Sequence, residues 1–492
     1  MSAIHDQAMN YVYQQVLHRL LSFFSRAERT ALQLLIQRLI VTAGGIERIA
    51  DFKVMVTYSG TRDSCYTLAF LRAAQLSIAG RAPATFQLRV VTLRLNGTTP
   101  ATLANIHRSY AALFVYDDPR VDVLMVDGRE ITPFNHSHPQ SVAGHDQNRR
   151  NMLMIGHLRP AQGPLEGFDD CELAMAECLG QLARWEGGAD AFVSSDTSCQ
   201  QKQVLGRVTR VAHKVGLPVI LPGMTGYEGL FTLLDEFGGD CYRRLYAEHE
   251  QEGWQPAAGF VSRRSTTYIG IQDLVVGNME ERWPLLTDFL GFQPDEMAIH
   301  CNENEHASVL LSAHLHGLQA SYVQGRAYEA GFTEYMQRML VMMRRKNVPE
   351  RLCEQTQEVY GNASRIGEFR MTATTEAQNA LGVNEMQLVC LLFSPFVDAG
   401  AGLESFLRRC HPGMLVAMPE LHRALQGKPA PEQVMQWIAD VSGLSVSLVN
   451  TLYGMHSVPD VGEHQADEPH DPQSLPGSPA ERAALCDLSA RR

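Results

Sequence analysis

Short apolar, β-branched runs alternate with helix-like segments through the first half of the chain, and this alternation restricts the fold more than any other feature. Each run has the length of a buried strand, and segments with apolar residues at helical spacing separate the runs. Strands that alternate with helices form parallel sheets with helices on both faces. We therefore predict an α/β fold with a doubly wound, mainly parallel five-stranded sheet. The predicted strands are 52–58, 85–93, 121–126, 189–193 and 217–221.

The chain of 492 residues is too long for one ordinary core, which predicts at least two domains. We expect an N-terminal helical hairpin, then the α/β domain, then a mostly α-helical domain. A long polar insertion in the α/β domain is expected to be a lid or substrate loop, in particular at 129–151. The tail is rich in proline and acidic residues, so we expect it to be disordered. The predicted bounds are 1–50 for the hairpin, 51–240 for the α/β domain, 128–168 for the insertion, 257–455 for the helical domain and 456–492 for the tail.

The composition is that of a globular protein, with 45% hydrophobic and 20% charged residues. The net charge of −12 disfavours a broad nucleic-acid surface, because such surfaces neutralise phosphates with lysine and arginine. A tRNA partner is therefore less expected than a small-molecule or peptide substrate, and no membrane partner is expected. The cysteines are scattered, which favours a reducing, cytoplasmic setting over a disulfide framework. A homo-oligomer remains open.

A small, polar turn follows the first predicted strand and leads into a helix. In open α/β sheets, ligands bind outside the carboxyl ends of the strands, and helix N-termini favour anions. Gly60 permits a backbone conformation that is costly for other residues, and Ser59 and Ser64 supply hydroxyl groups. Asp63 can cap the helix or hold a metal ion. The pattern fits either a cradle for phosphates or an ordinary strand-to-helix turn.

The sequence of this turn, Ser59-Gly60-Thr61-Arg62-Asp63-Ser64, resembles a known signature. It is similar to the Ser-Gly-Gly-x-Asp-Ser motif of the PP-loop (N-type) ATP pyrophosphatases, which include asparagine synthetases, sugar amidotransferases and deazaguanine nitrile synthases. The resemblance covers roughly the first half of the chain and implies a HUP-type, Rossmann-like sheet that binds ATP and Mg²⁺. Thr61 stands where the motif has its second glycine, the position at which the backbone comes closest to the pyrophosphate.

The resemblance also implies an activity, that of an AMP-forming ligase. Such an enzyme adenylates a small-molecule or peptide-linked carboxylate or carbonyl oxygen, releases pyrophosphate, and transfers the activated group to a nitrogen or sulfur nucleophile. Catalytic roles would then belong to Asp63, Ser64 and Arg62, with Asp63 also near Mg²⁺. The residues implied to cradle the pyrophosphate are Ser59, Gly60, Thr61 and Ser64.

Other predicted strands end in polar residues that supply further candidates. Asp127 follows the third strand and could touch a ribose or merely begin a turn. Asp196, after the fourth strand, is a candidate metal ligand, and Lys202 a candidate phosphate ligand. The alternative for this second segment is a capped helix, with Asp196 or Ser198 as the cap.

Rival assignments are weaker. The chain has no Gly-x-Ser-x-Gly elbow, no Gly-x-Gly-x-x-Gly turn after the first strand and no Gly-x-x-x-x-Gly-Lys-Ser/Thr loop. The histidines at 300–306, His314 and His316 do not have the spacing of a helical zinc motif, so we interpret them as polar residues of a helix entry. The remaining alternative is a non-catalytic nucleotide-binding or protein-interaction protein with a degenerate PP-loop fold, in which Thr61 marks the loss of turnover.

Overall fold

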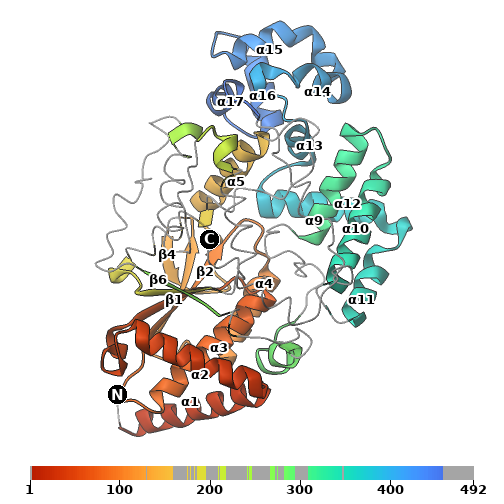
Figure 1. The fold of residues 1–492 in the computed structure, drawn as a ribbon. Coiled ribbons are helices and arrows are strands. Elements are labelled where there is room, and N and C mark those ends of the chain that lie inside the picture. Colours follow the sequence, from red (N-terminus) through yellow and green to blue (C-terminus); the bar gives the residue numbers. More distant parts are fainter. Residues whose placement is uncertain are drawn as a thin grey trace, which may run out of the picture. The chain divides into compact units, whose positions relative to one another are not determined.

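Figure 1 shows the computed structural model of the chain. The described residues belong to one compact unit, Met1–Val458. Residues 458–492, which make up most of the predicted tail, lie outside the described residues. The structure describes residues 3–128, 130–158, 174, 175, 178, 182, 185–194, 209, 211–217, 241, 243–246, 266–271, 274, 282–293, 308–345, 348 and 350–457. In that part of the chain, no helix combines the length and apolar character needed to cross a membrane.

Two helices precede the sheet, α1 (Ala3–Phe23) and α2 (Arg26–Thr42). Ser25 separates them and forms a capping box with Glu28. The Ser25 hydroxyl accepts from the Glu28 N–H at 3.2 Å, and the Glu28 carboxylate accepts from the Ser25 N–H at 2.8 Å. These bonds satisfy amide groups that a helix start leaves without partners, so they fix where α2 begins.

The sheet has six strands in the order β4-β3-β2-β1-β5-β6. All neighbouring pairs are parallel except β3 and β4, which are antiparallel. Four predicted strands correspond to β1, β2, β3 and β5, so the prediction of an α/β fold with a mostly parallel sheet is confirmed. The strands are β1 (Lys53–Thr57), β2 (Gln87–Arg94), β3 (Val121–Asp127), β4 (Glu130–Pro133), β5 (Ala191–Ser194) and β6 (Thr267–Gly270).

The predicted number of five strands is wrong for the described residues. Strand β4 lies in the segment interpreted as a polar insertion. Strand β6 lies beyond the predicted end of the α/β domain, in the run 260–274, whose sequence fits either a strand or a connector. Both are short and carry little apolar signal, and each is held by pairing with a neighbouring strand. The predicted strand at 217–221 falls almost entirely outside the described residues.

Helices cover both faces of the sheet. Successive residues of a strand point to opposite faces. Val54 and Val56 of β1 pack with apolar side chains of α1, α2, α3 (Arg62–Ala79) and α4 (Pro100–Ala112). Met55 packs on the other side, in a cluster that contains α5 (Val142–His157) and the C-terminal helices. The strand ends between these two layers are therefore held from both sides.

The described part of the predicted insertion is folded, because it contains β4 and α5. Ser141 caps α5, and its hydroxyl accepts from the Gly144 N–H at 3.4 Å. Along α5, Gly156 packs against Leu391, and the Arg149 guanidinium donates to the Gly443 carbonyl at 2.8 Å. Helix α5 thus joins the sheet to the C-terminal helices.

Every regular element in the described part of residues 308–457 is helical. Apolar residues at helical spacing predict helices at 305–318, 328–346, 349–360, 386–393, 431–441 and 445–453, and an α-helix lies in each of these ranges. Helices α12, α14 and α15 were not predicted. The α-helices are α9 (Val309–Leu318), α10 (Tyr328–Arg345), α11 (Glu350–Tyr360), α12 (Ile366–Glu376), α13 (Glu385–Phe393), α14 (Leu403–Cys410), α15 (Met418–Leu425), α16 (Glu432–Ser442) and α17 (Val446–Tyr453).

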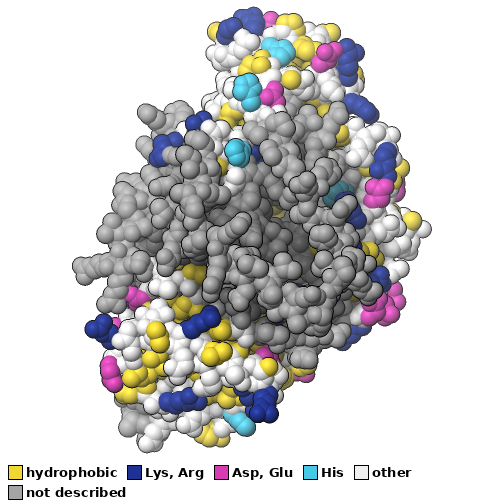
Figure 2. Space-filling model, in the orientation of Figure 1, with side chains coloured by type: hydrophobic (Ala, Val, Ile, Leu, Met, Phe, Trp, Pro, Cys, Tyr) yellow, Lys and Arg dark blue, Asp and Glu magenta, His cyan; other side chains and the backbone are white. Residues whose placement is uncertain are grey.

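Figure 2 shows one face of the molecule, on which yellow apolar and dark blue basic side chains are mixed at the lower end, where Figure 1 draws α1 and α2.

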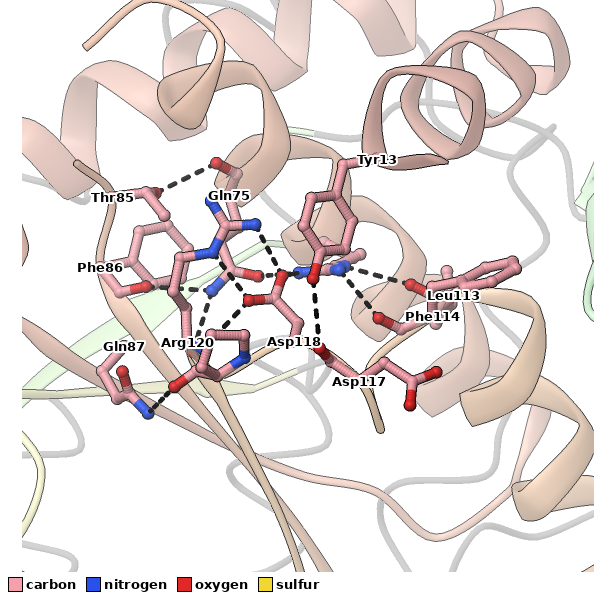
Figure 3. A network of polar contacts seen from close by, with 12 residues as sticks. Tyr13, Gln75, Thr85, Phe86, Gln87, Leu113, Phe114, Asp117, Asp118 and Arg120 are labelled. Atoms are coloured by element: carbon pink, nitrogen blue, oxygen red, sulfur yellow. Dashed lines mark hydrogen bonds and ion pairs between the residues drawn. The ribbon is translucent and has the colours of Figure 1, made fainter. Parts of the chain in front are cut away.

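A buried polar network ties α3 to the amino ends of β2 and β3 (Figure 3). The Arg72 guanidinium donates to the carbonyls of Leu113 and Phe114, at 3.2 and 3.1 Å, and these carbonyls stand at the end of α4. Gln75 donates to the carbonyls of Phe86 and Arg120, at 3.0 and 3.2 Å, just before β2 and β3. The network fixes the amino edge of the sheet, opposite the edge that carries the candidate site.

Candidate functional site

The candidate site lies at the carboxyl end of β1. Reading from β3 through β2 to β1, the strand order runs against the chain, and beyond β1 it continues with β5 and β6. The order therefore reverses between β1 and β5, where residues Val54 to Val56 pair with Ala191 to Val193. In open α/β sheets such a reversal opens a crevice in which ligands bind. Residues 59–64, called the 59–64 turn below, leave β1 at this point.

The backbone of the 59–64 turn explains one of its two small positions. Gly60 has a φ of +75°, a conformation that side chains disfavour. A Cβ atom on Gly60 would lie 2.8 Å from Cγ1 of Ile106 in α4. Thr61, by contrast, has a φ of −76° and a ψ of 161°, which any residue adopts. The threonine that departs from the PP-loop motif is therefore unstrained in its own backbone.

Three hydroxyl groups converge in the turn. The Ser59 hydroxyl lies 3.0 Å from that of Thr61 and 3.3 Å from that of Ser64, and the Thr61 and Ser64 hydroxyls are 3.2 Å apart. The Ser64 hydroxyl also donates to the Thr61 carbonyl at 2.9 Å. Ser59 is exposed and Ser64 is buried. The cluster can therefore present hydroxyl groups to a ligand while its base stays packed.

Arg62 and Asp63 begin α3. The Arg62 Nε atom lies 3.7 Å from Oδ1 of Asp63, and the two side chains are 20% and 15% exposed. Thr61 is the N-cap residue, but its side chain makes no cap hydrogen bond to the helix. Carboxylate and hydroxyl oxygens are suitable ligands for Mg²⁺, so Asp63 and its neighbours fit that ion chemically. In the described part of the chain, however, no group of three or more His, Cys, Asp or Glu residues could hold a metal ion.

Asp127 ends β3, at the same edge of the sheet but two strands from β1. Its Oδ2 atom accepts from the Ser141 N–H at 2.8 Å and lies 3.9 Å from the Arg94 guanidinium. Burial raises the pKa of this carboxyl group. A Cβ atom on Gly144 would lie 2.8 Å from its Oδ1 atom, so α5 begins in close contact with Asp127. These contacts match the role of beginning a turn.

Several predicted residues are not brought into the described site. Asp196, Lys202 and Ser198 lie outside the described residues, as do the histidines of 300–306. His314 shares a hydrogen bond of 2.7 Å with the Tyr328 hydroxyl. His316 instead stacks on the ring of Tyr335, with centroids 4.8 Å apart. The two imidazoles therefore contact different side chains and do not form a pair.

Polar residues at the end of β2 were not predicted as part of the site. The Arg94 guanidinium donates to the His138 carbonyl at 2.6 Å. The Asn96 amide oxygen accepts from Gln140 at 2.8 Å and from Asn148 at 3.4 Å. These bonds fasten the β4–α5 segment over the carboxyl edge of the sheet. Arg94 directly follows the second predicted strand and Asn96 comes two residues later, so the rule that identified the 59–64 turn could have found them.

Comparisons with known proteins give no match. No protein-family model matches the sequence, no curated protein matches it, and no solved structure matches the chain.

Proposed function

We propose that the chain is an ATP-dependent, AMP-forming ligase with its nucleotide site at the 59–64 turn. In this proposal the sheet is a HUP-type, PP-loop-like nucleotide domain, and the described helices after residue 308 shape the acceptor site. The enzyme adenylates a carboxylate or carbonyl oxygen of a small molecule or peptide and then transfers the activated group to a nitrogen or sulfur nucleophile. ATP and Mg²⁺ are the required ligands, and tRNA is a less favoured acceptor.

One observation supports this proposal above the others. Three hydroxyl groups converge within 3.0 to 3.3 Å of one another on the strand end where the sheet order reverses. Convergent donors at the start of a helix suit an anion, because the helix dipole and the N–H groups of the first turn attract negative charge. The position and the chemistry of the turn thus agree.

In the chemical step, the residues of the turn have different roles. A substrate oxygen forms a bond to the α-phosphorus of ATP while the bond to the bridging oxygen of pyrophosphate breaks, and the electron pair leaves with pyrophosphate. Ser59, Thr61 and Ser64 would rotate their hydroxyl protons away from their partners within the turn and donate hydrogen bonds to that leaving group. Bound Mg²⁺ would neutralise part of its charge, with Asp63 as a ligand or as the residue that orients the turn. Arg62 would meet the departing phosphate.

Thermal unfolding in the presence of Mg²⁺ and ATP tests the binding part of the proposal. A ligand that binds only the folded state raises the melting temperature. The double variant Ser59→Ala, Asp63→Ala should lose this rise and still fold. The matched control is Ser22→Ala, Asp51→Ala, which replaces exposed residues of the same types away from the turn. An unchanged melting temperature of the native chain in millimolar ATP would contradict the proposal.

The alternative, a non-catalytic nucleotide-binding or interaction protein, gives a different result in the same experiment series. That protein would show the rise in melting temperature but no conversion of ATP with any acceptor. The variant Thr61→Gly would then restore pyrophosphate release if the threonine side chain is the obstacle. The unstrained backbone of Thr61 favours the ligase over this non-catalytic alternative. A threonine in place of the motif's second glycine costs the turn no conformational strain.

A further inference from the structure

A buried hydrogen bond joins the two residues that flank the 59–64 turn. Tyr58 comes directly before the turn and Cys65 directly after it. The Tyr58 hydroxyl and the Cys65 Sγ atom are 3.0 Å apart, and each residue is only 1% exposed. We propose that Tyr58 and Cys65 are positioning residues, whose hydrogen bond fastens the two ends of the turn to each other.

Both residues are themselves held by the surrounding sheet and helices. The Tyr58 N–H donates to the Val91 carbonyl of β2 at 2.7 Å, and its ring packs on that of Tyr110 in α4, with centroids 5.0 Å apart. The Cys65 N–H donates to the Thr61 carbonyl at 2.9 Å, inside the first turn of α3. The bond between the two side chains therefore connects the strand side of the turn to its helix side.

The pair is neutral, and this suits its place under an anion site. Burial raises the pKa of the Cys65 thiol to about 12, and burial also raises the pKa of Tyr58 well above its usual range. Both groups keep their protons at neutral pH, so neither adds negative charge beneath a bound phosphate. A protonated, inaccessible thiol is also a poor nucleophile, which leaves Cys65 with a positioning role.

The bond between Tyr58 and Cys65 sets the spacing of the hydroxyl groups next to it. Ser59 and Ser64 are the neighbours of Tyr58 and Cys65 in sequence, and their hydroxyl groups lie 3.3 Å apart. If the ends of the turn separate, this distance grows and the donors no longer converge on one ligand. The part of the inference that concerns ligand affinity rests on the proposed function, whereas the part that concerns the turn's order does not.

The test compares two tyrosine variants of the full chain. Tyr58→Phe removes the hydroxyl that bridges the turn. The matched control, Tyr110→Phe, removes a neighbouring buried hydroxyl that shares a bond of 2.8 Å with Thr92 and does not span the turn. Each loses one buried hydrogen bond, so both should lower the melting temperature to a similar extent. Hydrogen exchange of the amides of residues 59–65, measured without ligand, distinguishes them.

We expect Tyr58→Phe to speed exchange in the turn by about tenfold, and Tyr110→Phe to leave it unchanged. ATP affinity should fall by about tenfold in Tyr58→Phe alone. Cys65→Ala should behave like Tyr58→Phe, while Cys65→Ser, which keeps a hydrogen-bonding group, should restore slow exchange. Equal exchange in the two tyrosine variants would overturn the inference. If the native chain binds no ATP but Tyr58→Phe still loosens the turn, only the proposed function fails.

Discussion

The Arg72 guanidinium donates to the Asp118 carboxylate at 2.8 Å, and neither side chain is exposed to solvent. Arg120 also donates to this carboxylate, with both oxygens accepting at 2.7 Å. Burial alone would raise the pKa of Asp118, but the hydrogen bonds and charges of Arg120 and Arg72 outweigh it and hold that pKa below its usual range. Asp118 thus stays ionised in the interior because two cations surround it.

Replacement of this carboxylate should be costly. Asp118→Asn leaves the Arg72 charge buried without its counter-ion, and we expect the free energy of unfolding to fall by about 3 to 5 kcal/mol in urea titrations. The control is Glu334→Gln, which breaks an ion pair with Arg326 in which both side chains are about half exposed. That change should leave the free energy of unfolding nearly unchanged, because solvent screens an exposed ion pair. Similar losses in the two variants would show that the buried network contributes no more to stability than an exposed ion pair.

Gly60 should not tolerate a side chain. Gly60→Ala meets both a left-handed backbone and the contact with Ile106, which together should cost about 2 to 4 kcal/mol of stability. Gly80→Ala is the matched control, because Gly80 has an ordinary helical φ of −78° and a Cβ atom there would lie 3.5 Å from its nearest neighbour. Urea titration should show a change within about 0.5 kcal/mol for the control. Equal effects would contradict the geometry of the turn.

The buried His314 should make stability depend on pH. Burial lowers its pKa to about 4, with Glu385 raising it and Arg370 lowering it further. The unfolded chain therefore binds more protons between about pH 6.5 and pH 4, so stability falls as the pH falls through this window. From pH 7 to pH 5 this group should account for about 2 kcal/mol of lost stability.

The measurement is the free energy of unfolding at several pH values, in the native chain and in His314→Gln. The variant should lose less stability on acidification, because it lacks the group that gains a proton on unfolding. His18→Gln, which replaces an exposed imidazole of α1, controls for the loss of a histidine as such. Parallel curves for the native chain and His314→Gln would refute the assignment.

The strands that sequence analysis found are those with a strong local signal. Residues Val54, Met55 and Val56 are buried on both faces of the sheet and are all apolar, so β1 is visible in the sequence as an unbroken apolar run. β4 and β6 have no such run, with burial patterns in which at most one residue is buried. Their existence depends on pairing with β3 and β5, and β6 lies far from β5 along the chain. A local pattern contains no information about that pairing.

The candidate site also has one part that local sequence predicts and another that depends on packing. The 59–64 turn could be predicted because its small and polar residues are contiguous and follow a recognisable strand. The contact between Gly60 and Ile106 and the bond between Tyr58 and Cys65 depend on how α4 and α3 pack. The segment with β4 and α5 was interpreted as a loop because its first residues are polar, while the apolar residues that anchor α5, Met152 to Ile155, come at its end.

The product formed from ATP labelled at its α-phosphate tests the central claim most directly. The full chain is incubated with labelled ATP, Mg²⁺ and pooled small metabolites and peptides. A turn that holds the β- and γ-phosphates as one leaving group directs attack to the α-phosphorus, so the account predicts labelled AMP together with pyrophosphate. Ser64→Ala removes the bond to the Thr61 carbonyl and so lowers stability somewhat, but it should slow this reaction more than that loss of stability explains. Labelled ADP as the main product would contradict the account, because it would place the attack on the γ-phosphate.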